Sequence, residues 1–330
     1  MPQTQTRRSF LSMAVLAGAA GLLSPRRGSA AEPALETTTV RLARAPVICF
    51  APQYVCEALL RADGFTDVRY VDRTSQGNWK TSGVAISISI RACRSRTLSR
   101  SITGGRSPSS PVCTLAAMSF SAHGGIRGIA DLKGKSVGHG GSTELISMMA
   151  AYVGLDPKKD LTLVDDPAAK PVDLFAEGKL DAYLAFPPEV QELHARKVGH
   201  VILRTAVDRP WSQYFCCMLA ANREYASRYP VATKRVIRAV LKAADLCASE
   251  PEVAARLIVQ GGFTERYDYA LQTLTENPYG AWREYDAEDT IRFYALRLHE
   301  LGMIKSSPQK IIADGADWRF LDEIKREMKA

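Results

Sequence analysis

Three short segments place glycine, hydroxyl or aromatic residues where predicted strands turn into helices. Gly140-Gly141-Ser142-Thr143 follows a predicted strand over 135–138, and its glycines let the backbone come close to a bound molecule. Ser142 or Thr143 can cap the next helix or donate a hydrogen bond to a ligand oxygen. Ligands of open α/β sheets gather beyond the carboxyl ends of strands. We therefore expect Gly141, Ser142 and Thr143 to line a ligand site.

The other two segments contribute aromatic rings. Phe50 and Tyr54 follow the first predicted strand and offer flat faces to a flat ligand, and Phe186 ends a later strand just before a helix. His139, beside the glycine turn, and Tyr214 complete the set of candidate ligand-binding residues. The structural alternatives are a core aromatic, a turn with a capped helix, and a proline that starts a helix.

The elements that would position these residues alternate between strand and helix. An apolar, β-rich run over 40–50, a helix over 52–62 and a strand over 67–71 open the chain in β-α-β order. From residue 126 the same alternation returns, with strands over 135–138, 161–164, 179–186 and 200–204 and helices over 144–154, 171–177 and 189–197. This order predicts an α/β fold whose second sheet is mostly parallel with helices on its faces.

The last third of the chain reads mainly as helix. An apolar strand is expected over 213–220, and amphipathic helices over 233–249 and 287–301. Each of these helices has an apolar stripe that needs a core to cover.

Charge is distributed unevenly. The 330 residues include 43 Lys and Arg against 35 Asp and Glu, a net charge of +8. No acidic residue lies between Asp72 and Asp131, whereas eight cationic residues do, so this segment holds the whole excess. A basic patch of that kind would normally suggest a polyanionic partner.

The Arg- and Ser-rich stretch within that segment, residues 91–112, has three interpretations. A nucleic-acid arm is disfavoured because Lys and aromatic residues are not interleaved with the arginines. A flexible linker of this length would interrupt a compact lobe. We favour the third, in which residues 73–121 arise from a shifted reading frame, because GC-rich DNA read out of frame enriches Arg, Ser, Pro and Gly. We accordingly expect residues 81–121 to be poorly ordered and no nucleic acid to bind.

The N-terminus resembles a twin-arginine export signal. Arg7-Arg8 precede an apolar run over 10–23, and the small residues of 28–31 suit a signal peptidase. A short membrane anchor is the alternative, but 14 apolar residues fall short of the roughly 20 that span a bilayer. We expect residues 1–31 to be removed on export to the periplasm.

The seven cysteines do not form a recognisable framework. They contain no CxxC pair, and Cys216 and Cys217 would point to opposite faces of a strand. We expect buried packing rather than a metal site, and the sequence suggests no cofactor.

Several longer phrases carry a family resemblance. The chain contains IRGIADLKGKSVG, EGKLDAYLAFPPE, SRYPVATKRVIRAVLKAADL and LGMIKSSPQKIIADGADWRFLDEIKRE. Together they resemble the substrate-binding proteins of ABC transporters in the SsuA/TauA/NMT1/THI5-like group, over residues 40–72 and 123–330. The resemblance implies a two-lobed periplasmic binding protein of type II, with residues 40–121 and 222–330 in lobe one and 122–221 in lobe two.

The resemblance also implies a function. Such a protein is expected to be a non-catalytic monomer that holds a small organic ligand between its lobes and delivers it to a membrane permease, its only link to the membrane. The three segments above would then face one another across a single groove. The alternative is an enzyme, because the group also resembles the THI5-like pyrimidine synthase of thiamine formation, to whose Cys-rich iron segment Cys216-Cys217 is weakly similar.

Sulfonates, pyrimidines and aromatic acids are the ligand classes that stay open. Glu144, in the first turn of the helix after the glycine turn, stabilises that helix but would repel an anion if it faced the groove. A neutral or cationic heteroaromatic ligand is therefore a serious alternative to a sulfonate.

Overall fold

The computed structural model describes residues 32–45, 47–72, 84–86, 113–114, 118–140, 143–164, 170–215 and 217–328. The expected signal peptide lies outside these ranges, as does most of the suspected frame-shifted segment 73–121. The expectation of poor order over 81–121 therefore falls mainly outside the described residues. No helix in the described ranges combines the length and the apolar character that crossing a membrane requires.

The chain opens with the predicted β-α-β unit. Strand β1 (Thr39–Arg44) pairs in parallel with β2 (Asp67–Asp72), and the helices α2 (Ala51–Val55) and α3 (Glu57–Ala62) connect them. The apolar run over 40–50 is only partly strand, because Ile48–Phe50 forms a 3-10 helix, η2. Pro52 lies in the first turn of α2, where the missing N–H costs nothing.

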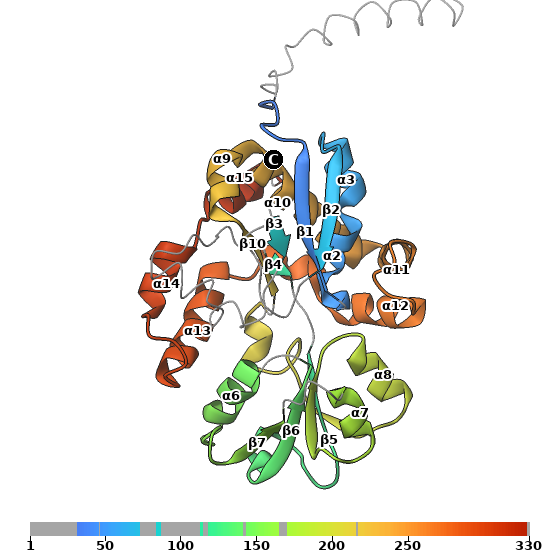
Figure 1. Cartoon of the computed structure of the whole chain (residues 1–330), viewed down its shortest axis with the longest axis vertical. Helices are drawn as coiled ribbons and strands as arrows, with labels where there is room; N and C mark the ends of the chain where they lie inside the picture. The colour runs from blue at the N-terminus through green and yellow to red at the C-terminus, as the bar shows by residue number, and fades with distance from the viewer. Residues whose placement is uncertain are drawn as a thin grey trace, which may run out of the picture. The chain divides into compact units, whose positions relative to one another are not determined.

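A second sheet joins segments that lie far apart in the sequence. Strand β10 (Cys217–Ala221) runs antiparallel to both β3 (Val84–Ile86) and β4 (Cys113–Thr114), which flank it. Strand β10 begins four residues later than expected because Trp211–Gln213 forms a 3-10 helix, η5. This sheet lies beside β1, in the upper part of Figure 1.

The third sheet has five strands in the order β7-β6-β8-β5-β9. These are β7 (Leu161–Val164), β6 (Lys135–His139), β8 (Ala182–Ala185), β5 (Ser119–Ala122) and β9 (His200–Arg204). Strand β5 runs antiparallel to β8 and β9, whereas β6 pairs in parallel with β7 and β8. The prediction of a mostly parallel sheet is confirmed, since β5 alone runs against the others.

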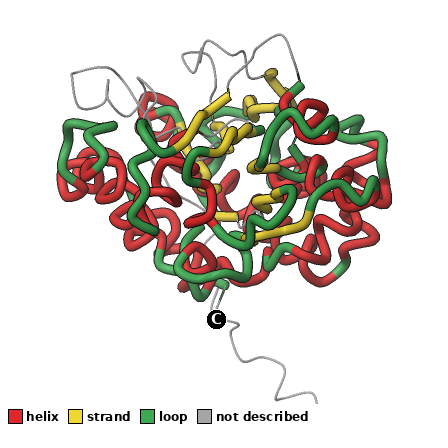
Figure 2. Tube along the Cα trace, turned by 90° about the horizontal axis from the view of Figure 1, so that it is seen from below, coloured by secondary structure: helices red, strands yellow, loops and turns green. Residues whose placement is uncertain are grey.

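Helices cover this sheet, as expected. α6 (Thr143–Tyr152) follows β6, α7 (Pro171–Ala176) follows β7, and α8 (Glu189–Ala195) follows β8 (Figure 1). All four residues of β8 are buried, which fits a central strand packed on both faces. Figure 2 shows helices lying outside the strands.

The C-terminal part of the chain is helical, as predicted. Its helices are α9 (Arg223–Arg228), α10 (Pro230–Ser249), α11 (Pro251–Gln260), α12 (Tyr267–Glu276), η6 (Tyr279–Arg283), α13 (Ala287–Glu300), α14 (Pro308–Gly315) and α15 (Arg319–Glu327). Helix α10 buries Val236, Val240 and Ala243, the stripe that its sequence predicts. Asn222, Asp286 and Ser307 cap α9, α13 and α14 through side-chain oxygens.

Candidate functional site

The glycine turn and the Phe186 segment lie side by side at one edge of the five-stranded sheet. Strands β6 and β8 are parallel neighbours, with His139 opposite Leu184, so both end at that edge. The Gly140 N–H donates to the Leu184 carbonyl at 3.0 Å. A Cβ atom added to Gly140 would lie 3.2 Å from Cδ2 of Phe186. Two of the three predicted segments are therefore adjacent.

A carboxylate lies against the same glycine. The Tyr183 hydroxyl donates to Oε2 of Glu189 at 2.7 Å. A Cβ atom on Gly140 would lie 2.7 Å from that oxygen and 3.2 Å from the Tyr183 hydroxyl. A side chain at position 140 would therefore displace the end of the flexible Glu189 side chain and press on Tyr183 and Phe186, so glycine permits this close approach.

Burial shifts the acidities of this pair. It raises the pKa of the partly buried Glu189, while the hydrogen bond from Tyr183 opposes that shift. Burial, and then the Glu189 charge, raise the pKa of Tyr183 far above its usual range, so the phenol keeps its proton and acts as a donor. Sequence reasoning missed both residues, because their proximity depends on the return of the chain from β8 into α8.

Lobe one reaches this edge through η2. The Ile48 N–H donates to the Pro187 carbonyl at 3.2 Å, directly after Phe186. A second link lies nearby, where Nε2 of Gln191 on α8 donates to Oε2 of Glu276 on α12 at 3.3 Å. The segment that holds Phe50 thus meets the segment that holds Phe186.

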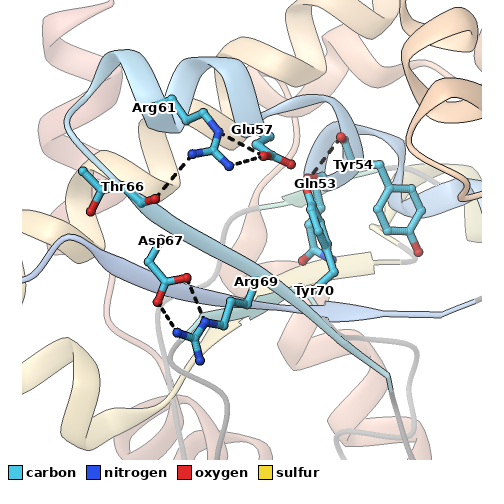
Figure 3. Close-up of polar contacts among 8 residues, drawn as sticks. All are labelled: Gln53, Tyr54, Glu57, Arg61, Thr66, Asp67, Arg69 and Tyr70. Atoms are coloured by element: carbon cyan, nitrogen blue, oxygen red, sulfur yellow. Dashed lines mark hydrogen bonds and ion pairs between the residues drawn. The ribbon is translucent and has the colours of Figure 1, made fainter.

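Phe50 and Tyr54 lie in the packed part of that segment, 3% and 4% exposed. The Tyr54 hydroxyl donates to the Ala45 carbonyl at 2.6 Å, and its ring stacks on Phe263 with centroids 4.0 Å apart. The Tyr70 hydroxyl donates to the Gln53 carbonyl at 3.1 Å, so it braces the same helix (Figure 3). One face of the Tyr54 ring is therefore occupied by Phe263.

The other residues predicted to bind the ligand lie on β6, at the start of α6 and between β9 and β10. His139 is buried at the end of β6, and Thr143 begins α6, where its carbonyl accepts a hydrogen bond from the Ser147 hydroxyl at 2.8 Å. Tyr214 lies in the connection between β9 and β10, where it stacks on Phe293 of α13 with centroids 3.9 Å apart. Gly141 and Ser142 lie outside the described residues.

The described cysteines lie in packed surroundings. Cys56 and Cys247 are fully buried, and burial raises the pKa of each thiol. Across the ranges that the structure describes, no cluster of three His, Cys, Asp or Glu side chains has the arrangement to hold a metal ion. Cys217 is buried on β10, and its neighbour Cys216 is not among the described residues.

The fold is that of the periplasmic binding proteins of type II. Residues 132–260 match the model of the NMT1-like family. No curated protein matches the sequence. The match agrees with the resemblance inferred from the sequence, and that resemblance to ABC substrate-binding proteins is confirmed.

Solved structures with this fold include binding proteins and an enzyme. The periplasmic nitrate-binding protein NrtA from Synechocystis PCC 6803 is 14% identical, with a TM-score of 0.71 over 89% of this chain and 90% of that one. The periplasmic sulfonate-binding protein SsuA from Methylobacillus flagellatus KT, described as putative, is 14% identical, with a TM-score of 0.64 over 90% and 96%. The desulfurization enzyme DSZB is 13% identical, with a TM-score of 0.57 over 88% and 99%.

Proposed function

We propose that this protein is the solute-binding component of an ABC importer and holds a small organic ligand between two α/β lobes without catalysing a reaction. Residues 40–121 and 222–330 form lobe one in this proposal, and residues 122–221 form lobe two. The strand pairing supports a division near these boundaries, because β5 pairs within the five-stranded sheet and β10 pairs with β3 and β4.

One observation carries the proposal. The hydrogen bond from the Ile48 N–H to the Pro187 carbonyl joins the first helical turn of lobe one to the strand-end edge of lobe two. Gly140 and Phe186 are at the same edge. A small molecule bound there would touch both lobes, and its binding would bias their separation.

The ligand-binding residues in this proposal are those expected from the sequence. They are Phe50, Tyr54, His139, Gly141, Ser142, Thr143, Phe186 and Tyr214. Among them Phe186 has the strongest support, because it lies against Gly140 beside the lobe-one contact. Sulfonates, pyrimidines and aromatic acids are the candidate ligand classes.

The cellular setting follows from the same proposal. The chain acts as a periplasmic monomer, reaches the periplasm by the twin-arginine route after loss of residues 1–31, and docks on an ABC permease.

Residues 73–121 are a frame-shifted replacement for part of lobe one. Resequencing the gene tests this last point, and peptides from residues 91–111 together with an uninterrupted reading frame would contradict it.

An enzyme is the second candidate, and its support is the likeness of the fold to DSZB. Cell fractionation separates the two, because uncleaved protein that accumulates in the cytoplasm would favour the enzyme.

A thermal-shift screen of sulfonates, pyrimidines and aromatic acids tests the binding role. A ligand that binds only the folded state raises the melting temperature, and the rise grows with the logarithm of its concentration divided by its Kd. We expect one chemical class to give a concentration-dependent rise. A screen in which no class shifts the transition would contradict the proposal.

A further inference from the structure

We infer that the lobe-two wall of the site selects a ligand with a hydrogen-bond-donating nitrogen group, a protonated amine or amidine, and that Glu189 is the residue that selects it. The inference rests on the proposed function, since it assigns the chemical class of ligand to the same site. It differs from the nitrate and sulfonate named for the structures of similar fold.

Position is the first support. Oε2 of Glu189 would lie 2.7 Å from a Cβ atom at Gly140, so the carboxylate fills the place that a side chain would otherwise take at the end of β6. Phe186 lines the same spot, and the Pro187 carbonyl next to it accepts the hydrogen bond from lobe one. The charge therefore lies at the junction of the two lobes.

Charge balance is the second support. Among the described residues, no Lys, Arg or His forms an ion pair with Glu189. The neighbouring charges that act on it, Glu192 and Asp173, are of the same sign. The nearby cation Arg196 is already committed to those two, at 2.9 Å from Glu192 and 3.7 Å from Asp173.

The partners that Glu189 does have, the Tyr183 hydroxyl and the backbone of Phe186, are neutral. Tyr183 donates one hydrogen bond to Oε2 and brings no positive charge. A carboxylate withdrawn from water without a cation costs free energy, and a cationic donor restores the balance through short, charge-assisted hydrogen bonds. An amine or amidine of the ligand supplies such a donor.

A second acidic residue follows Gly140 in the chain. Glu144 is 5% exposed in the first turn of α6, the helix that begins three residues after Gly140. Helices α6 and α8 each have an acidic residue in the first turn. A negative side chain there weakens the attraction of a helix N-terminus for an oxyanion. An oxyanion in the site would face like charge from Glu189.

The test compares two probes of similar shape and opposite charge. Benzamidinium and benzoate are titrated into the full chain by calorimetry at neutral pH, with nitrate as a third probe. We expect benzamidinium to bind, and Glu189→Gln to weaken it by about tenfold to a hundredfold, the worth of a charge-assisted hydrogen bond. Glutamine can still accept the Tyr183 hydrogen bond, so the fold is retained, as a melting temperature no lower than that of the wild type would verify.

Glu192→Gln is the matched control. It removes the same charge three residues along α8, where the carboxylate is bonded to Arg196 on the surface. We expect it to change benzamidinium affinity by no more than about twofold. An equal loss of benzamidinium affinity in both variants would overturn the inference. It would show that the overall negative charge of this surface, and not Glu189 itself, attracts the ligand.

The outcomes separate this inference from the proposed function. Binding of benzoate or nitrate in place of benzamidinium would overturn the inference and leave a solute-binding site in place. Benzamidinium affinity that Glu189→Gln does not change would also overturn it. Absence of binding by all three probes contradicts the inference, and the proposed function then depends on the separate thermal-shift screen.

Discussion

At the scale of single residues, Gly140 shapes the site because glycine has no side chain. Gly140 lets the Glu189 carboxylate and the Tyr183 hydroxyl approach the end of β6. The importance of the glycine turn was predictable from its place after a strand. The roles of Glu189 and Tyr183 were not predictable, because the two residues lie on separate elements. Only the return of the chain from β8 into α8 brings them to Gly140.

The raised pKa of Glu189 has a measurable effect on stability. In the folded protein the carboxyl keeps its proton at pH values where the unfolded chain has lost it, so the wild-type protein loses stability as pH rises through that window. Glu189→Gln does not titrate. We therefore expect the variant to gain stability relative to wild type as pH rises above about 4, the usual pKa of a glutamate.

Urea unfolding of both proteins at a series of pH values measures this difference. The two proteins should converge at acidic pH, where both side chains are neutral. A stability difference that stays constant from acidic to neutral pH would contradict the account of Glu189.

At the scale of elements, local signals predicted most strands and helices. The strands over 161–164 and 200–204 have the predicted bounds, because they are short apolar runs between turns. The sequence predicts a β-rich run through Ile48–Phe50, which forms a 3-10 helix instead, because a short apolar segment does not by itself distinguish the two. Strands β3 and β4 were missed, because their pairing with β10 is non-local and their surroundings lack periodicity.

Helix α13 offers a direct test of one local signal. The Asp286 carboxylate accepts hydrogen bonds from the backbone N–H groups of Glu288 and Asp289, at 2.8 Å and 3.0 Å. Asp286→Ala leaves these donors without their cap and should lower the free energy of unfolding by about 1 kcal/mol. Chemical denaturation measures the loss.

Asp314→Ala is the control for that substitution. Asp314 forms an exposed ion pair with Lys310 at 2.8 Å within α14, and such pairs contribute only about 0.5 kcal/mol or less. Equal losses in the two variants would show that Asp286 acts through charge rather than as a cap.

At the scale of the whole molecule, two hydrogen bonds join segments that the proposed division places in different lobes. One is the bond between Ile48 and Pro187, and the other joins Gln191 to Glu276. The two-lobed class was predictable from the order of strands and helices together with the family resemblance. The particular contacts were not, since each joins residues more than 80 positions apart.

Export is a property of the whole chain and can be tested at its N-terminus. Replacing Arg7 and Arg8 with lysine keeps the charge but removes the twin-arginine pair. We expect the precursor to stay uncleaved in the cytoplasm, as fractionation and immunoblotting would show. Replacing the downstream pair Arg26 and Arg27 with lysine is the control and should leave export intact, and export of both variants would contradict the assignment.

The central claim is that one small molecule binds where Gly140 meets the lobe-one contact. Isothermal titration of the ligand identified by the thermal-shift screen tests it most directly, with Gly140→Leu beside Gly125→Leu. Leucine at 140 would occupy the space held by the Glu189 carboxylate and Phe186, whereas Gly125 has open space around it. The account predicts one ligand per chain, with binding lost in Gly140→Leu and kept in Gly125→Leu. Unchanged affinity in a folded Gly140→Leu variant would contradict it.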